Sequence, residues 1–249
     1  MILRLLALTI ATIFILSCST TKEHSEIQFD PKALFTDASK KIRKGEYEEA
    51  REALKKIQEK DVEKNYAVLT QIRLADSYYD EGSYEEAITE YKKFLTLYPF
   101  NKYATYVQYQ TAMSYFRQIE GADRNAVVIK NAIAEFEKLK KLYPRNPYKE
   151  EIEERLRIAR NLASEYEFYV GHFYYKKGSY KAATGRFEVL LKEYPKSPRE
   201  ADALYYLGLS YKELGNKEKA SNSFRLLLSE YPDHRNARDA KNIITKLQK

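Results

Sequence analysis

Small and aromatic residues return along the chain in a fixed pattern that predicts pairs of amphipathic helices. The motif Gly-x-Tyr-x-x-Ala occurs three times, and a fourth copy keeps its Gly and its Ala. The glycines of the four copies are Gly45, Gly82, Gly178 and Gly215. Each of the last three is followed 17 residues later by a proline that comes directly after a tyrosine. Because Gly tolerates positive φ after a helix and Pro stops the next helix, each copy predicts a helical hairpin.

One alanine per hairpin marks the repeat, and the spacing of these marker alanines shows where the repeat is interrupted. They are Ala50, Ala87, Ala132, Ala183 and Ala220, at steps of 37, 45, 51 and 37 residues. The first excess predicts a long loop over Gln118–Asn131. The second excess lies before Glu165, where neither Gly nor Pro occurs from Lys149 to Val170. It therefore predicts one extended helix about 40 Å long.

Apolar residues along this long helix alternate by four and three, which is typical of a seam for a neighbouring helix. The seam consists of Ile152, Leu156, Ala159, Ala163, Tyr166, Val170 and Phe173. Its C-terminal half is expected to pack within the molecule. For Ile152, Leu156 and Ala159 two interpretations stay open: they pack on the preceding unit, or they form a second partner surface.

The small residues at the helix crossings, with aromatics beside them, resemble the tetratricopeptide repeat. We therefore expect an all-α tetratricopeptide-repeat solenoid of about five helical hairpins with a C-terminal capping helix. The expected organisation is a signal peptide over 1–17, a lipidated flexible tether over 18–31 and the repeat domain over 32–249. The units roughly cover 31–64, 68–101, 105–146, 150–197 and 201–234, and the capping helix covers 236–248.

The N-terminus carries a targeting signal of its own. An apolar run over 5–16 follows Arg4, and it has the length of a signal-peptide core rather than of a membrane span. Cys18, the only cysteine, follows directly and resembles the acylated residue of a bacterial lipobox. We expect lipid attachment at Cys18, and Ser19 in the next position favours the outer membrane. The alternative is an ordinary secretory peptide cut near Ser17–Ser19, which would leave an idle thiol.

Composition and motif content argue against several classes of function. The chain has 249 residues, with 43 basic and 36 acidic residues and a net charge of +7. Both signs are interspersed, so the excess favours a solvated helical surface over a nucleic-acid-binding arm. His24, His172 and His234 have no His or Cys at metal-ligand spacing, and no phosphate loop or nucleophile elbow occurs. We therefore expect no enzyme, no cofactor and no metal site.

The binding feature that the sequence does predict is a groove on the concave face of the solenoid. In a tetratricopeptide solenoid the first helix of each unit lines the concave face, and here that face is rich in aromatic residues. We expect a partner or peptide groove formed by Phe35, Ile72, Tyr79, Tyr106, Tyr109, Phe116, Phe168 and Tyr175. The alternative is that tight curvature buries these residues against the next unit. His172 is expected to be a packed ring.

Several segments together resemble the BamD family, also called ComL or YfiO, of outer-membrane assembly lipoproteins. They are Cys18, Lys44–Tyr47, Asp123-Arg124, Leu162–Gly171 and Arg186–Glu188. The resemblance implies a lipid-anchored scaffold at the outer membrane that faces the periplasm. It also implies three kinds of partner: the barrel-forming subunit of the assembly complex, accessory lipoproteins, and nascent outer-membrane protein peptides.

Two other families stay open as alternatives. The segment Ser197–Leu204 equally resembles a periplasmic repeat protein that coordinates cell division and peptidoglycan processes with the Tol system. A pilotin-type lipoprotein that escorts a secretin is the other.

Overall fold

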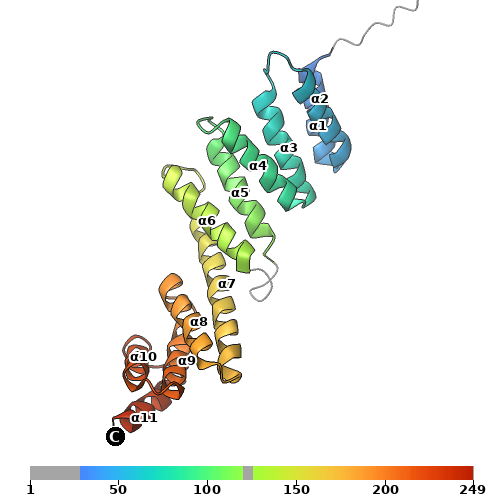
Figure 1. The fold of residues 1–249 in the computed structure, drawn as a ribbon. Helices are drawn as coiled ribbons and strands as arrows, with labels where there is room; N and C mark the ends of the chain where they lie inside the picture. The colour runs from blue at the N-terminus through green and yellow to red at the C-terminus, as the bar shows by residue number, and fades with distance from the viewer. Residues whose placement is uncertain (1–28, 120–125, 249) are drawn as a thin grey trace, which may run out of the picture. The chain divides into compact units, whose positions relative to one another are not determined.

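The computed structural model describes residues 29–119 and 126–248, and in these ranges every regular element is an α-helix. The compact unit runs from Pro31 to the C-terminus. Its helices follow one another along the chain (Figure 1): α1 Pro31–Lys44, α2 Tyr47–Lys60, α3 Ala67–Glu81, α4 Tyr84–Leu97, α5 Ala104–Arg117, α6 Ala126–Leu142, α7 Lys149–Lys176, α8 Tyr180–Glu193, α9 Glu200–Glu213, α10 Lys217–Glu230 and α11 Ala237–Leu247. The predicted all-α repeat fold is confirmed.

Helices pack chiefly on their neighbours in sequence, as expected for a solenoid in which each hairpin contacts the next. Odd-numbered helices also touch one another directly, α1 with α3 and α7 with α9. In these two places the first helices of successive hairpins therefore lie against each other. Helix α11 packs on α10 and covers the last hairpin.

The turns inside the hairpins depend on glycine at one position. Gly82 has φ 91° directly after α3, a conformation that costs other residues steric strain. Its N–H donates to the carbonyl of Tyr79 (3.1 Å), and the N–H of Ser83 donates to that of Tyr78 (2.9 Å). This pair of bonds satisfies two carbonyls that the end of α3 would otherwise leave unpaired. The expectation of a positive-φ glycine is confirmed here and at three more turns.

The core of each hairpin is built around its marker alanine. All five marker alanines are fully buried, and Phe136, Phe187 and Phe224 lie four residues after three of them, also fully buried. Two glycines let helices approach more closely than alanine would. A Cβ built on Gly171 would lie 2.7 Å from the ring of Phe187, and one on Gly208 would lie 2.6 Å from that of Phe224. At these two crossings the glycine backbone therefore lies directly against the phenylalanine ring, with no space for a methyl group.

The predicted loop over Gln118–Asn131 is wrong in its second part, because α6 begins at Ala126. Ile129, which falls in the expected loop, is fully buried with Ala159 and Ala163 of α7. This tertiary contact stabilises an additional N-terminal turn of helix that local sequence did not indicate. The long helix itself is confirmed: α7 has 28 residues and is about 42 Å long.

A buried carboxylate fixes α7 between its neighbours. Glu167 is fully buried, and its two oxygens accept from Lys130 of α6 (3.3 Å) and Arg186 of α8 (3.1 Å). A charge removed from water requires such partners. The three helices are thus held at one point where the long helix passes from one unit to the next.

Candidate partner-binding surfaces

The predicted groove residues fall into three places in the structure. Phe35 is on α1, where its ring lies 5.7 Å from that of Tyr66. Five lie on α3 and α5 and pack in two adjoining clusters that share Tyr79: Ile72, Tyr79, Tyr106, Tyr109 and Phe116. Phe168 and Tyr175 lie together on α7 and pack against α9. Ile72 and Tyr109 are 8% exposed, and the other six are half-buried, so the rings pack on one another and leave edges at the surface.

An acidic residue organises the part of this surface on α3 and α5. Asp76 is buried, and its Oδ1 accepts hydrogen bonds from the hydroxyls of Tyr91 (2.7 Å) and Tyr106 (2.8 Å). Burial raises the pKa of Asp76, while the two tyrosine hydroxyls act against this shift because they stabilise the carboxylate. Arg73 lies 3.8 Å from the other oxygen. The Tyr106 ring is therefore held in a fixed orientation.

Tyr109 and Phe116 extend the same surface along α5. The ring of Tyr109 stacks on that of Tyr148 at 4.2 Å, and the Arg155 guanidinium lies 5.3 Å from the Phe116 ring centre. Both contacts come from the start of α7 and its preceding loop. The N-terminal half of α7 thus closes one end of the aromatic surface on α5.

The interpretation of Ile152, Leu156 and Ala159 as a second partner surface is corrected by the structure. Their exposures are 0%, 1% and 0%. Ile152 and Leu156 pack with residues of α5 and α6, and Ala159 packs with Ile129 of α6. The seam from Ile152 to Ala163 serves the preceding hairpin, because α7 starts early enough to cover α6. A partner has no access to these side chains. Phe173, at the other end of the seam, is 47% exposed, so the expectation that the C-terminal half packs within the molecule is wrong for this residue.

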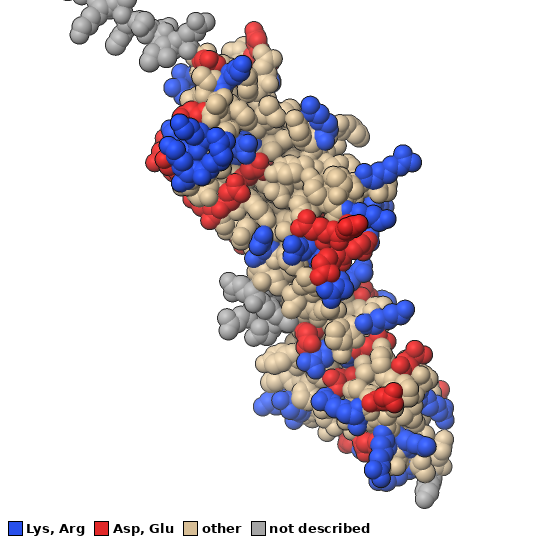
Figure 2. Space-filling view, turned by 180° about the vertical axis from the view of Figure 1, so that it is seen from behind, with Lys and Arg blue, Asp and Glu red and all other residues tan. Residues whose placement is uncertain are grey.

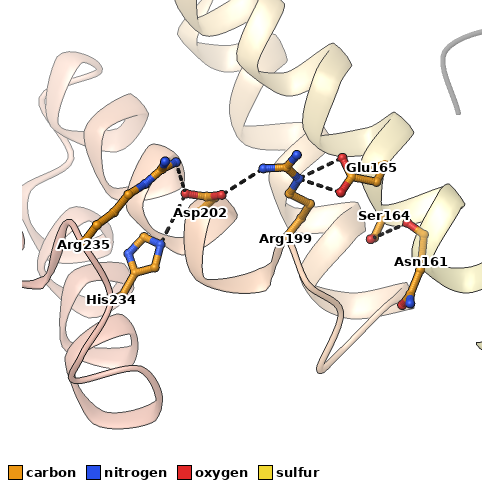
Figure 3. Close-up of polar contacts among 7 residues, drawn as sticks. All are labelled: Asn161, Ser164, Glu165, Arg199, Asp202, His234 and Arg235. Atoms are coloured by element: carbon orange, nitrogen blue, oxygen red, sulfur yellow. Dashed lines mark hydrogen bonds and ion pairs between the residues drawn. The ribbon is translucent and has the colours of Figure 1, made fainter.

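A line of charged residues crosses the C-terminal hairpins, and sequence reasoning missed it. Figure 3 shows Arg199 between Glu165 and Asp202, with His234 and Arg235 approaching Asp202 from the other side. Arg199 Nε lies 2.8 Å from both Glu165 oxygens, and its Nη1 lies 3.2 Å from Asp202 Oδ2. Asp202 Oδ1 accepts from Arg235 (2.8 Å) and lies 3.3 Å from His234 Nε2.

This charged line joins the last two hairpins to the loop that leads into the capping helix α11. Its members come from α7, from α9 and the loop before it, and from the loop before α11. The hydrogen bond to Glu165 raises the pKa of Arg199 above its ordinary value. Only the step of three residues from Arg199 to Asp202 was visible in the sequence, because Glu165 and Arg235 are 34 and 33 residues away from their partners.

We expect Arg199→Ala to lower the free energy of unfolding by about 1 kcal/mol, because it leaves Asp202 and Glu165 with fewer partners. The side chain is one-third exposed, which limits the loss. Chemical denaturation measures the change. Arg225→Ala is the matched control, since Arg225 is exposed on α10 and its replacement is expected to have no effect. Equal stability of the two variants would contradict a structural role for the charged line.

Aromatic rings pack beside the charged line. His172 stacks on Phe168 at 5.7 Å and lies 4.7 Å from the ring of Tyr206. Burial lowers the pKa of His172, and the nearby Lys176 adds to the shift. The Arg199 guanidinium covers Phe168 at 5.0 Å, and Tyr175 lies 5.2 Å from Tyr206. The expectation that His172 is a packed ring is confirmed.

No group of three or more His, Cys, Asp or Glu residues that could hold a metal ion occurs within 29–119 and 126–248. In the same part of the chain, no helix is long and apolar enough to cross a bilayer. Figure 2 shows Lys and Arg interspersed with Asp and Glu over one face of the molecule. Cys18 lies outside the described residues, so its acylation stays a prediction.

The fold defines the class of the protein: an all-α solenoid of the tetratricopeptide type. Comparison with known families places it more narrowly. The chain belongs to the YfiO family of outer membrane lipoproteins, whose model matches residues 27–226.

Three relatives with the same name illustrate the similarity. A protein of Xylella fastidiosa strain Temecula1, "outer membrane protein assembly factor BamD", is 27% identical over 214 residues, which cover 81% of this chain and 73% of that protein. The protein of the same name from Rickettsia prowazekii is 25% identical, with 80% and 79% covered. The one from Caulobacter vibrioides is 22% identical, with 69% and 56% covered, so the match spans just over half of that relative.

Solved structures of repeat proteins are also similar. A tetratricopeptide-repeat protein from Bacteroides fragilis matches with a TM-score of 0.49 and 13% identity, covering 88% of this chain and 99% of that one.

Proposed function

We propose that this chain is a non-enzymatic scaffold lipoprotein that helps recruit, fold and insert β-barrel proteins at the outer membrane. The observation that carries the proposal is the match of the outer membrane lipoprotein family over 27–226, in a chain whose relatives are outer membrane protein assembly factors. A solenoid suits this task because it offers a long surface without needing a closed pocket.

The proposed partner surface is the aromatic face of the first helices. On α3 and α5 it consists of Ile72, Tyr79, Tyr106, Tyr109 and Phe116, with Phe35 before them, and on α7 of Phe168 and Tyr175. Half-buried tyrosines suit an extended peptide or a partner helix, because each presents a ring edge and a hydroxyl without losing much side-chain entropy. The N-terminal set is proposed for nascent outer-membrane protein peptides and the C-terminal set for the barrel-forming subunit.

The proposed location is the periplasmic side of the outer membrane. The anchor would be a lipid on Cys18, followed by a tether of 13 residues up to Pro31. A segment of this length can reach at most about 45 Å, so the repeat domain would stay close to the bilayer.

Site-specific photocrosslinking in cells tests the partner surface. With a photoreactive amino acid at Tyr79 or Tyr175, we expect capture of a nascent barrel protein or of the barrel-forming subunit, because both rings are half-buried at the surface of the first helices. Thr89, exposed on α4 of the other helix layer, is the matched control and is expected to give no specific product. If Tyr79 and Tyr175 capture no outer-membrane assembly component, the proposed partner surface is wrong.

A further inference from the structure

Two loops of neighbouring hairpins lie side by side in the N-terminal half of the solenoid. They are residues 98–103 between α4 and α5, and residues 143–148 between α6 and α7. Figure 1 shows both on the same edge of the molecule. Together they line a pocket of about 560 Å³, with walls that include Tyr103, Tyr106, Tyr143 and Tyr148. We call this edge, with the ends of α4 and α6 that lead into it, the loop edge.

The loop edge exposes large apolar side chains outside the pocket. Phe100 is 100% exposed, and Leu97 and Leu142, at the ends of α4 and α6, are 55% and 54% exposed. None of the three lines the pocket, so they project into the surroundings. Exposed apolar side chains gathered on one edge are typical of a contact surface.

The repeat fold does not require these residues. Leu97 and Leu142 stand ten residues after their marker alanines, and the other hairpins have Lys60, Glu193 and Glu230 at that position. Phe100 stands thirteen residues after its marker alanine. The other hairpins have charged residues there: Glu63, Arg145, Lys196 and Asp233. A solvated residue thus suffices for folding at these two positions, where the second hairpin has Leu97 and Phe100 and the third has Leu142.

The loop edge also contains no acidic residue of its own, and the nearest ones in sequence are Glu150 and Glu151 in the first turn of α7. In the sequence no Asp or Glu stands between Glu90 and Glu120, nor between Glu137 and Glu150. The pocket walls carry two cations, Lys102 and Arg145. Neither of them forms an ion pair with any residue within 29–119 or 126–248. An exposed surface that joins apolar side chains to unpaired cations complements an anionic, amphipathic partner.

We propose that the loop edge contacts a phospholipid membrane surface. Phe100, Leu97 and Leu142 enter the interface between headgroups and acyl chains, and Lys102 and Arg145 lie at the headgroup phosphates. A membrane fits better than a peptide because Phe100 is a protruding ring on a loop tip, and a fluid interface can receive it without a matching cavity.

Such a contact is weak alone and gains from a tether that keeps the domain near the bilayer. To that extent it rests on the lipid anchor of the proposed function. In the proposed function, the lipid anchor and the loop edge together would orient the aromatic face of the solenoid relative to the membrane.

In the test, the mature chain is bound to vesicles through a tag that replaces its own lipid anchor. The chain from Ser19 onward carries an N-terminal histidine tag bound to nickel-chelating lipid, in vesicles of phosphatidylethanolamine and phosphatidylglycerol. Since Cys18 is the only cysteine, Phe100→Cys or Leu142→Cys gives a single thiol for an environment-sensitive fluorophore. Leu226→Cys on α10, at an exposed leucine outside the loop edge, is the matched control.

We expect nitroxide-labelled lipids to quench the fluorophore roughly threefold or more strongly at positions 100 and 142 than at position 226. The pair Lys102→Glu and Arg145→Glu is expected to reduce this difference, as is replacing phosphatidylglycerol by phosphatidylcholine. Equal quenching at all three positions would overturn the proposal. Shielding at position 100 only after addition of an outer-membrane assembly partner would also overturn it and indicate a protein-docking surface. Because the histidine tag replaces the acyl chain, neither outcome depends on Cys18.

Discussion

Gly208→Ala is expected to lower the free energy of unfolding by about 1–3 kcal/mol. The added Cβ would lie 2.6 Å from Phe224 Cε1 and 2.7 Å from Cζ, well inside van der Waals contact. The Phe224 ring is fully buried among its neighbours, so it can move only by disturbing the packing of α9 against α10. Helix propensity alone favours alanine, and the loss therefore measures the steric cost of the crossing. Chemical denaturation followed by circular dichroism gives the value.

Gly185→Ala is the matched control for this prediction. Gly185 also lies inside a helix, α8, but a Cβ there would meet nothing within 4 Å. The same chemical change is expected to raise stability by about 0.5–1 kcal/mol. In the double variant Gly208→Ala with Phe224→Leu, the steric cost is expected to be smaller, because the phenylalanine ring that the added Cβ would meet is gone. If both glycine variants change the free energy of unfolding in the same direction, the close crossing of α9 and α10 is contradicted.

Cys18→Ala is expected to move nearly all of the protein out of the membrane fraction. The proposed attachment depends on acyl chains at Cys18, the one cysteine of the sequence. Loss of two or more chains removes far more binding free energy than the loop edge can supply. Cell fractionation followed by immunoblotting measures the distribution.

Ser19→Ala is the control for the anchor, since it changes the neighbouring residue and leaves the thiol in place. It is expected to stay in the membrane fraction. If Cys18→Ala also stays there after washing with high salt, the lipoprotein proposal is wrong and another segment holds the chain.

The repeat architecture was predictable because it depends on local signals. Gly82 and its equivalents end the first helix of a hairpin through backbone conformation alone, and the marker alanines set a spacing that survives the insertions. The length of α7 was predictable for the same reason, since neither Gly nor Pro occurs from Lys149 to Val170.

The surface was less predictable, because it depends on contacts between distant segments. The early start of α6 follows from burial of Ile129 against α7, and the burial of Ile152 and Leu156 follows from the way α7 covers α5 and α6. The long-range ion pairs of the line, Glu165 with Arg199 and Asp202 with Arg235, exist only when α7, α9 and the loop before α11 are all in place. A heptad seam indicates that a helix has a neighbour, but it does not tell whether that neighbour belongs to the same chain.

Depletion of the chain in its own cells tests the central claim most directly. Folded outer-membrane β-barrel proteins are expected to fall several-fold, as measured by the shift in gel mobility between unheated and heated samples, while their unfolded precursors accumulate in the periplasm. The wild-type gene should restore them. Unchanged levels of folded barrel proteins after complete depletion would contradict a role in outer-membrane protein assembly.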